Sequence, residues 1–207
     1  LFQSPVTTEA GDARLPGAGI WATAAEGFHG SDNSTDIHFA TASSETAKHA
    51  DQIRMTINHD GNVGIGTVNP ETDLEVSDSG TNAQAEIRLS TYNDQPNHYP
   101  MLTLLKSNTD TADSPSATAE NDHLGQIRFM GVDSGGNIDY GAYIIAKQVA
   151  AANAGTTLAT NLIFQTYGTG GTNTDQFVLD SDGNVGIGTS SPNSAMHIRD
   201  NSQRSIE

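Results

Sequence analysis

The residues best suited to bind a metal form an acidic turn late in the chain. The run Asp180-Ser181-Asp182-Gly183-Asn184 places side-chain oxygens at alternate positions, as in the first half of a calcium loop. Such a loop needs a carboxylate at its twelfth position, and that position is Ser191. The related run Asn58-His59-Asp60-Gly61-Asn62 has Asn69 there. Both runs are therefore interpreted as plain turns, and no metal or cofactor is expected.

Histidine is the other ligand type that could bind a metal here, because the chain contains no cysteine. No two of the seven histidines have the i, i+2 or i, i+4 spacing of a metal site. In a threefold assembly, one histidine near the axis could bind a metal together with its two copies. His38 and His197 are the candidates for this role because both fall on expected strands. The alternative is that each is a surface or half-buried histidine.

Signals of catalysis are weak. No Gly-x-Ser-x-Gly elbow of a serine hydrolase occurs. The pair Gly64-x-Gly66 lacks the third glycine of a dinucleotide loop and opens no helix. A glycosidase needs two carboxylates across a groove, and the sequence alone cannot pair its many carboxylates. We therefore name no catalytic residue and expect a protein that is not an enzyme.

Receptor contact, if this chain makes it, is expected from loops on a rigid β-scaffold. One candidate is the polar loop from Tyr92 to Pro100, in which Tyr92, His98 and Tyr99 could stack on and hydrogen-bond to a carbohydrate. A second candidate is the long loop from Asn108 to Asp122. The alternative is that both are solvated loops of a shaft.

An octapeptide repeat organises the chain. Asp60-Gly61-Asn62-Val63-Gly64-Ile65-Gly66-Thr67 returns letter for letter at residues 182–189. Apolar residues precede each copy at alternate positions, and a proline follows each copy, Pro70 and Pro192. Alternating residues on either side of an Asp-Gly turn predict a β-hairpin. One folding unit is therefore used twice.

Each copy predicts one apolar side and one glycine side. Side chains alternate along a strand, so the valine and isoleucine share a face and the two glycines share the other. Glycine weakens a strand and is expected where another backbone comes close. We expect these residues to pack between protomers: Val63, Gly64, Ile65, Gly66, Val185, Gly186, Ile187 and Gly188. The alternative is an ordinary hairpin in a monomeric β-sandwich.

The composition favours association and excludes some partners. Leu, Ile, Val and Phe make up about 19% of the 207 residues, and the formal net charge is −16. A chain with so few large apolar residues buries enough apolar surface only if part of its core forms between copies of the chain. The acidic balance argues against nucleic acid. No apolar run approaches the roughly 18 residues of a membrane span, and no signal peptide is visible, so membrane insertion is not expected.

The predicted organisation is all-β in four regions. Residues 1–36 form an extended lead-in, 37–79 the first β-repeat, 80–160 an inserted β-region with long loops, and 161–207 the second β-repeat. Strands are expected at 37–41, 53–57, 85–90, 101–105, 124–129, 140–149 and 162–166. For the strand expected at 140–149, the alternative is a helix over 144–152. The flanking glycines and aromatic residues favour the strand.

The repeat resembles a signature of bacteriophage tail-fibre and related host-attachment proteins. The resemblance rests on Asp-Gly-Asn-Val-Gly-Ile-Gly-Thr, two residues, proline and an apolar strand, over residues 51–77 and 174–200. It implies an elongated parallel homotrimer with intertwined β-prism or shaft-like segments around a central β-sandwich-like region. Many members of that family end in an intramolecular chaperone domain, which this sequence does not contain.

The resemblance implies a structural and binding role for the chain. We expect a segment of a trimeric tail fibre or spike, located in the virion and facing the exterior, that attaches to a host cell-surface receptor such as a carbohydrate. Two alternatives stay open: a trimeric tailspike enzyme that degrades host polysaccharide, and a bacterial surface adhesin.

Overall fold

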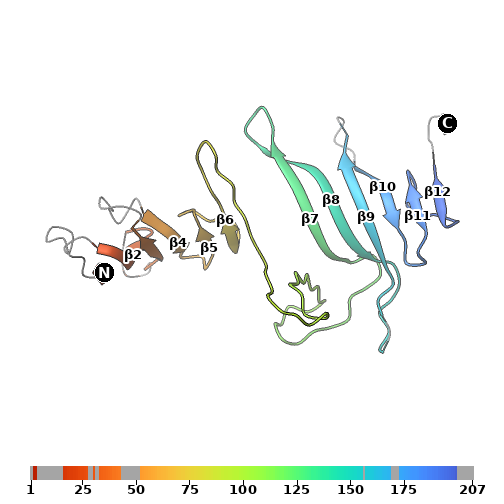
Figure 1. Ribbon diagram of the computed structural model, residues 1–207, viewed down its shortest axis with the longest axis horizontal. Coiled ribbons are helices and arrows are strands. Elements are labelled where there is room, and N and C mark those ends of the chain that lie inside the picture. The colour runs from red at the N-terminus through yellow and green to blue at the C-terminus, as the bar shows by residue number, and fades with distance from the viewer. Residues whose placement is uncertain are drawn as a thin grey trace. The chain divides into compact units, whose positions relative to one another are not determined.

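The computed structural model describes residues 2–3, 16–27, 30, 33–42, 52–155, 157–168 and 173–199. These residues form strands, turns and loops, and no helix among them could cross a membrane. The chain divides into two units, Leu1–Pro100 and Met101–Glu207, and each contains one six-stranded mixed sheet (Figure 1). The predicted all-β class is confirmed. The boundary between the units falls inside region 80–160, which was predicted to be a single insertion.

The sheet of the first unit follows chain order from β1 to β6. The strands are β1 (Phe2–Gln3), β2 (Pro16–Ala24), β3 (Thr35–Thr41), β4 (Ile53–Ile57), β5 (Val63–Ile65) and β6 (Leu74–Val76). All neighbours are antiparallel except β5 and β6, which are parallel. Strand β2 lies within residues 1–36, the predicted extended lead-in. Its Gly- and Ala-rich sequence lacks apolar alternation, and its pairing with β3 makes it a strand.

The sheet of the second unit runs in the reverse spatial order, β12-β11-β10-β9-β8-β7. Its strands are β7 (His123–Val132), β8 (Ile138–Gln148), β9 (Thr160–Tyr167), β10 (Asn173–Leu179), β11 (Val185–Ile187) and β12 (Met196–Ile198). Strand β8 pairs with β7 over residues 138–147 and with β9 over residues 142–148, which confirms the strand prediction and excludes the helical alternative.

The two octapeptide copies adopt the same hairpin and crossover. Ile65 pairs with Met55 in the first unit, and Ile187 pairs with Phe177 in the second. In each copy a short crossover then returns the chain to a parallel strand, β6 beside β5 and β12 beside β11. The first glycine of each turn has positive φ, +90° at Gly61 and +85° at Gly183, which tight hairpin turns favour.

Two predicted strands are not strands in the structure. Residues 85–90 alternate in apolar side chains and residues 101–105 are mostly apolar, but neither segment has strand hydrogen bonding among the described residues (Figure 1). A strand requires a neighbour to receive its backbone hydrogen bonds, and the periodicity of one segment cannot supply that neighbour. Their apolar side chains consequently stay exposed, with Ile87 at 72% and Leu105 at 86%.

Hydrogen bonds fix the conformation of the long loop from Asn108 to Asp122. The Asn108 amide donates to the Ser116 carbonyl, and the Ala119 amide donates to the Asp122 carboxylate. At its end, the Thr118 hydroxyl donates to the side-chain oxygen of the fully buried Gln148. The loop is therefore part of the second unit's packing.

Candidate functional site

An exposed apolar face covers one side of the sheet in the second unit. Cross-strand pairing places Phe177, Phe164, Ile144 and Ile127 in one row across β10, β9, β8 and β7. Phe164 and Phe177 pack edge to face with ring centres 5.3 Å apart. Both rings nevertheless remain 37% exposed, and Ile127 is 47% exposed. We call the side of the sheet that carries this row the apolar face of the second unit.

The sheet of the first unit has an equivalent apolar face. Ile65, Met55, Phe39 and Ile20 form its row across β5, β4, β3 and β2. Ile65 and Ile20 are 44% and 47% exposed. The same repeat positions thus point to the same side in both units, because the hairpin register is identical.

The opposite side of each sheet is the buried one. In the second unit it carries Ile145, Ile163 and Val178, which form the cluster of buried apolar residues. In the first unit it carries Thr56 and His38, both buried. Each unit therefore has a small core of its own on one side and a larger uncovered apolar surface on the other.

Gly64 and Gly186 face the buried side, as the alternation predicts, but their close neighbour is their own chain. A Cβ on Gly64 would lie 2.6 Å from the Thr67 carbonyl oxygen, and one on Gly186 would lie 2.5 Å from that of Thr189. The residues that need this space are those of the crossover before the parallel strand. The close backbone approach is thus explained within one chain, and a role of Gly64 and Gly186 between protomers stays a prediction.

Gly66 and Gly188 have a second reason to be glycine. Both have positive φ, +78° and +71°. A Cβ at either position would lie less than 3 Å from the carbonyl oxygen of Ser77 or Arg199 respectively. The remaining predicted packing residues divide by exposure: Ile65 and Ile187 are exposed on the apolar face, and Val63 and Val185 are half-buried beside them.

The predicted histidine ligands have different surroundings. Both ring nitrogens of His38 are within hydrogen-bond distance of threonine hydroxyls, at 2.8 Å from Thr23 and 3.0 Å from Thr56. His38 therefore has no nitrogen left for a metal, which corrects that candidate. The Nδ1 atom of His197 is buried and has no hydrogen-bond partner in the described chain.

The acidic turn uses its carboxylate to hold the backbone. Oδ1 of Asp180 accepts hydrogen bonds from the amides of Asp182 and Asn184. Burial acts to raise the pKa of Asp180, but the hydrogen bonds from Asn184 and Asp182 outweigh it and lower the pKa below its usual value. In the first copy Asn58 accepts the equivalent two amide bonds, from Asp60 and Asn62. A neutral oxygen serves equally well at this position, which fits a turn and not a calcium site.

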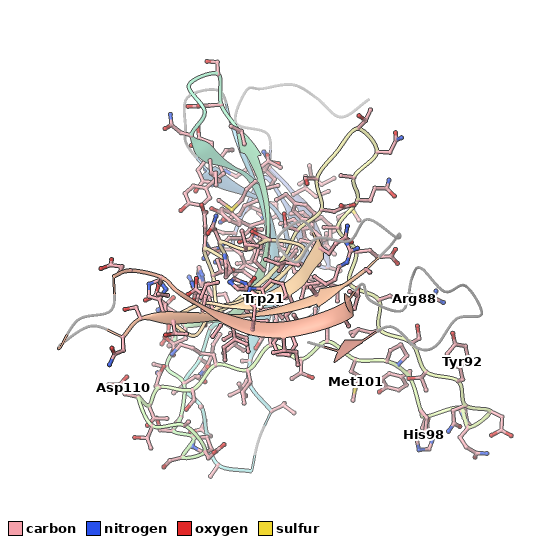
Figure 2. All side chains as sticks on the ribbon, turned by 90° about the vertical axis from the view of Figure 1, so that its left-hand side faces the viewer. Trp21, Arg88, Tyr92, His98, Met101 and Asp110 are labelled. Carbon is pink, nitrogen blue, oxygen red and sulfur yellow. The ribbon has the colours of Figure 1, made fainter. Side chains whose placement is uncertain are left out.

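The predicted receptor residues are all exposed to solvent. Tyr92 is 90% and Tyr99 63% exposed, and His98 is also exposed. Figure 2 shows the Tyr92 and His98 side chains on the same projecting segment of the first unit. The second predicted loop encloses an open hollow of about 600 Å³, lined by Leu105, Ser107, Thr109, Asp110, Thr111, Ala112, Asp113 and Pro115. The structure places all of these residues on the surface and does not assign them a ligand.

A cluster of three tyrosines was missed in the sequence. Tyr140, Tyr143 and Tyr167 lie with their ring centres 5.7 to 6.0 Å apart in the second unit. Tyr140 and Tyr143 have the spacing of opposite strand faces, so sequence reasoning separates them. Tyr140 and Tyr143 can share a face only if the alternation of the strand is interrupted between them. Gly141 was the available sign of such an interruption, because a glycine inside a strand often marks a bulge.

The fold is similar to that of solved bacteriophage proteins. A search of protein-family models and a search of curated proteins both found no match. Among solved structures, the carboxy-terminal domain of the bacteriophage T5 L-shaped tail fibre matches with a TM-score of 0.69 and 11% identity, over 93% of this chain and 80% of that one. The same domain with its intra-molecular chaperone domain matches equally well, over 55% of its length. At this identity the likeness shows a shared fold.

Proposed function

We propose that this chain is a segment of a homotrimeric tail fibre or spike of a bacteriophage, which attaches the virion to the host cell surface. The observation that carries the proposal is the pair of apolar faces, each exposed in a single chain and each built from the same repeat. Burying apolar surface contributes about 25 cal/mol per Å², so exposed faces of this kind strongly favour association. The fold likeness to a T5 tail-fibre domain supports the same assignment.

The association that we propose pairs the apolar faces and uses the unpaired segments. Segment 85–90 has the alternating pattern of a strand and segment 101–105 is mostly apolar, and a neighbouring copy would supply the hydrogen-bonding edge that the described part of their own chain does not. Intertwined β-structure of this kind completes a core that no protomer contains alone. Val63, Ile65, Val185 and Ile187 then become interior residues of the assembly.

The mechanism of attachment that we propose is multivalent binding. Three identical chains present three copies of any receptor-binding surface, so weak contacts add through effective concentration. The protein that we propose is part of the virion and faces the cell exterior. The acidic net charge of −16 supports a role without nucleic acid and favours solubility of an exposed assembly.

The measurement that tests the assembly is molar mass in solution. Size-exclusion chromatography with light scattering should give about three times the 21.7 kDa chain mass. A stable monomer would contradict the proposal. A dimer would keep association but reject the threefold arrangement.

We further propose that the role is binding without catalysis. The polysaccharide-degrading alternative predicts release of reducing sugar when the assembled protein is incubated with capsule or lipopolysaccharide. We expect no release above the rate of a heat-inactivated sample. Measurable release would favour the tailspike enzyme, and a bacterial adhesin would instead be recognised from a genome neighbourhood without virion genes.

A further inference from the structure

An irregular pairing in β8 brings the tyrosine cluster together. Ala142 pairs with Phe129, but the next paired residue is Tyr140, opposite Met130, so Gly141 is an extra residue in β8. Such a β-bulge changes the side of the sheet to which the side chain beyond the extra residue points, here that of Tyr140. Without it, Tyr140 would point to the apolar face. With it, Tyr140 lies on the same side as Tyr143.

The third ring comes from the neighbouring strand. Tyr167 lies on β9 at an even spacing from the buried Ile163, so it points to the same side as Tyr143, which packs against Ile163. The Tyr140 and Tyr167 rings are nearly parallel, at 25° and 6.0 Å between centres. Tyr143 meets Tyr167 edge on at 5.7 Å. Strands β8 and β9 lie side by side in Figure 1, and the three rings on them contact one another with centres 5.7 to 6.0 Å apart.

The surface combines apolar faces with polar groups. Tyr140 is 50% exposed, whereas Tyr143 and Tyr167 are half-buried. Burial, followed by a hydrogen bond with Tyr167, raises the pKa of Tyr143 to about 12, so the Tyr143 hydroxyl is protonated at physiological pH. Arg128 pairs across the strands with Tyr143 and adds a hydrogen-bond donor group to this side.

The cluster stays accessible in the proposed assembly. It lies on the side of the sheet opposite to the apolar face that carries Ile144 and Phe164, because its members share the side of Ile145 and Ile163. Self-association through the apolar face therefore leaves the exposure of Tyr140 unchanged, at 50%. A ligand from outside the assembly can reach Tyr140.

We propose that Tyr140, Tyr143 and Tyr167 form a binding subsite for a neutral oligosaccharide of the host surface. The exposed face of the Tyr140 ring suits the C–H face of a pyranose, and the phenol and guanidinium groups suit its hydroxyls. The net charge of −16 disfavours an acidic polysaccharide, so the sugar is neutral. This inference rests on the proposed function and names the class of receptor and the residues that contact it.

The test uses the assembled protein on an array of neutral and acidic bacterial surface oligosaccharides. We expect binding to neutral glycans, a loss of at least tenfold in Tyr140→Ala, and retention within about twofold in Tyr140→Phe, which keeps the ring. Val68→Ala is the control, since Val68 is also an exposed side chain, lies between β5 and β6 of the first unit, and is not part of the tyrosine cluster. Its binding should equal that of the unchanged protein.

Several outcomes would overturn the subsite. They are binding to acidic glycans alone, no binding to neutral glycans, equal losses in Tyr140→Ala and Tyr140→Phe, or an equal loss in Val68→Ala and Tyr140→Ala. Light scattering on every variant separates this result from the proposed function. A trimer without glycan binding rejects only the subsite, and a drop in mass in Tyr140→Ala would show that the cluster is an interface between copies.

Discussion

The crossover of the octapeptide repeat makes a sharp prediction about two glycines in the same copy. Gly183 and Gly188 both have positive φ, at +85° and +71°. Alanine at either position therefore adopts a disfavoured backbone conformation, which costs about 1 kcal/mol or somewhat more. The two sites differ in their surroundings. A Cβ on Gly183 meets nothing within 4 Å, whereas one on Gly188 meets the Arg199 carbonyl oxygen at a distance that real side chains avoid.

The additional cost at Gly188 can be worked out from its hydrogen bonds. The Arg199 amide donates to the Ile187 carbonyl at 2.8 Å, and the Gly188 amide donates to the Gln176 carbonyl at 3.0 Å. Moving the backbone far enough to admit a methyl group weakens both bonds. Each contributes about 0.5–1.5 kcal/mol. Gly188→Ala should thus destabilise the protein by about 2 kcal/mol more than Gly183→Ala.

Urea unfolding of the assembled protein at fixed protomer concentration measures this difference. Hydrogen exchange of the Arg199 amide gives a local readout, and it should accelerate in Gly188→Ala but not in Gly183→Ala. The first copy supplies an internal replicate, because Gly66 and Gly61 differ in the same way. Equal destabilisation by the two alanines would refute the reasoning, since it would mean that positive φ alone decides the choice of glycine.

Three further predictions concern the apolar face, the acidic turn and the buried amide. Phe164→Asp should lower the solution mass toward that of one chain by placing a charge on the apolar face, whereas Asn97→Asp, which adds the same charge on an exposed loop, should leave the mass unchanged. The folded-state pKa of Asp180 lies below its unfolded value of 3.8, so its contribution to stability is present above that pH and lost as pH falls through the folded-state pKa. Asp180→Asn, which copies the equivalent Asn58, should keep the turn and remove this part of the acid sensitivity in urea unfolding between pH 7 and pH 3; an unchanged pH dependence would contradict the assignment. Gln148→Ala should cost roughly 2–4 kcal/mol in the same measurement, because it opens a cavity and leaves the Thr118 hydroxyl without its partner, and a cost under about 1 kcal/mol would show that water replaces the amide.

The sequence by itself determined the local elements that depend on short-range pattern. The repeated octapeptide predicts the hairpin, and in the structure Ile65 is exposed, Val63 is half-buried and Gly64 is buried on the other side. Alternation and turn glycines act within a few residues, so one sequence suffices to place them.

Only the tertiary structure decided what each element meets. Segments 85–90 and 101–105 have strand patterns but no neighbouring strand in the described chain, and β2 became a strand through β3 despite its weak pattern. The close neighbour of Gly64 is its own crossover, which no alternation rule could show. The tyrosine cluster depends on a single extra residue, Gly141, that changes the side of Tyr140. Pairing and close approach are long-range contacts, and they depend on which segments the whole fold brings together.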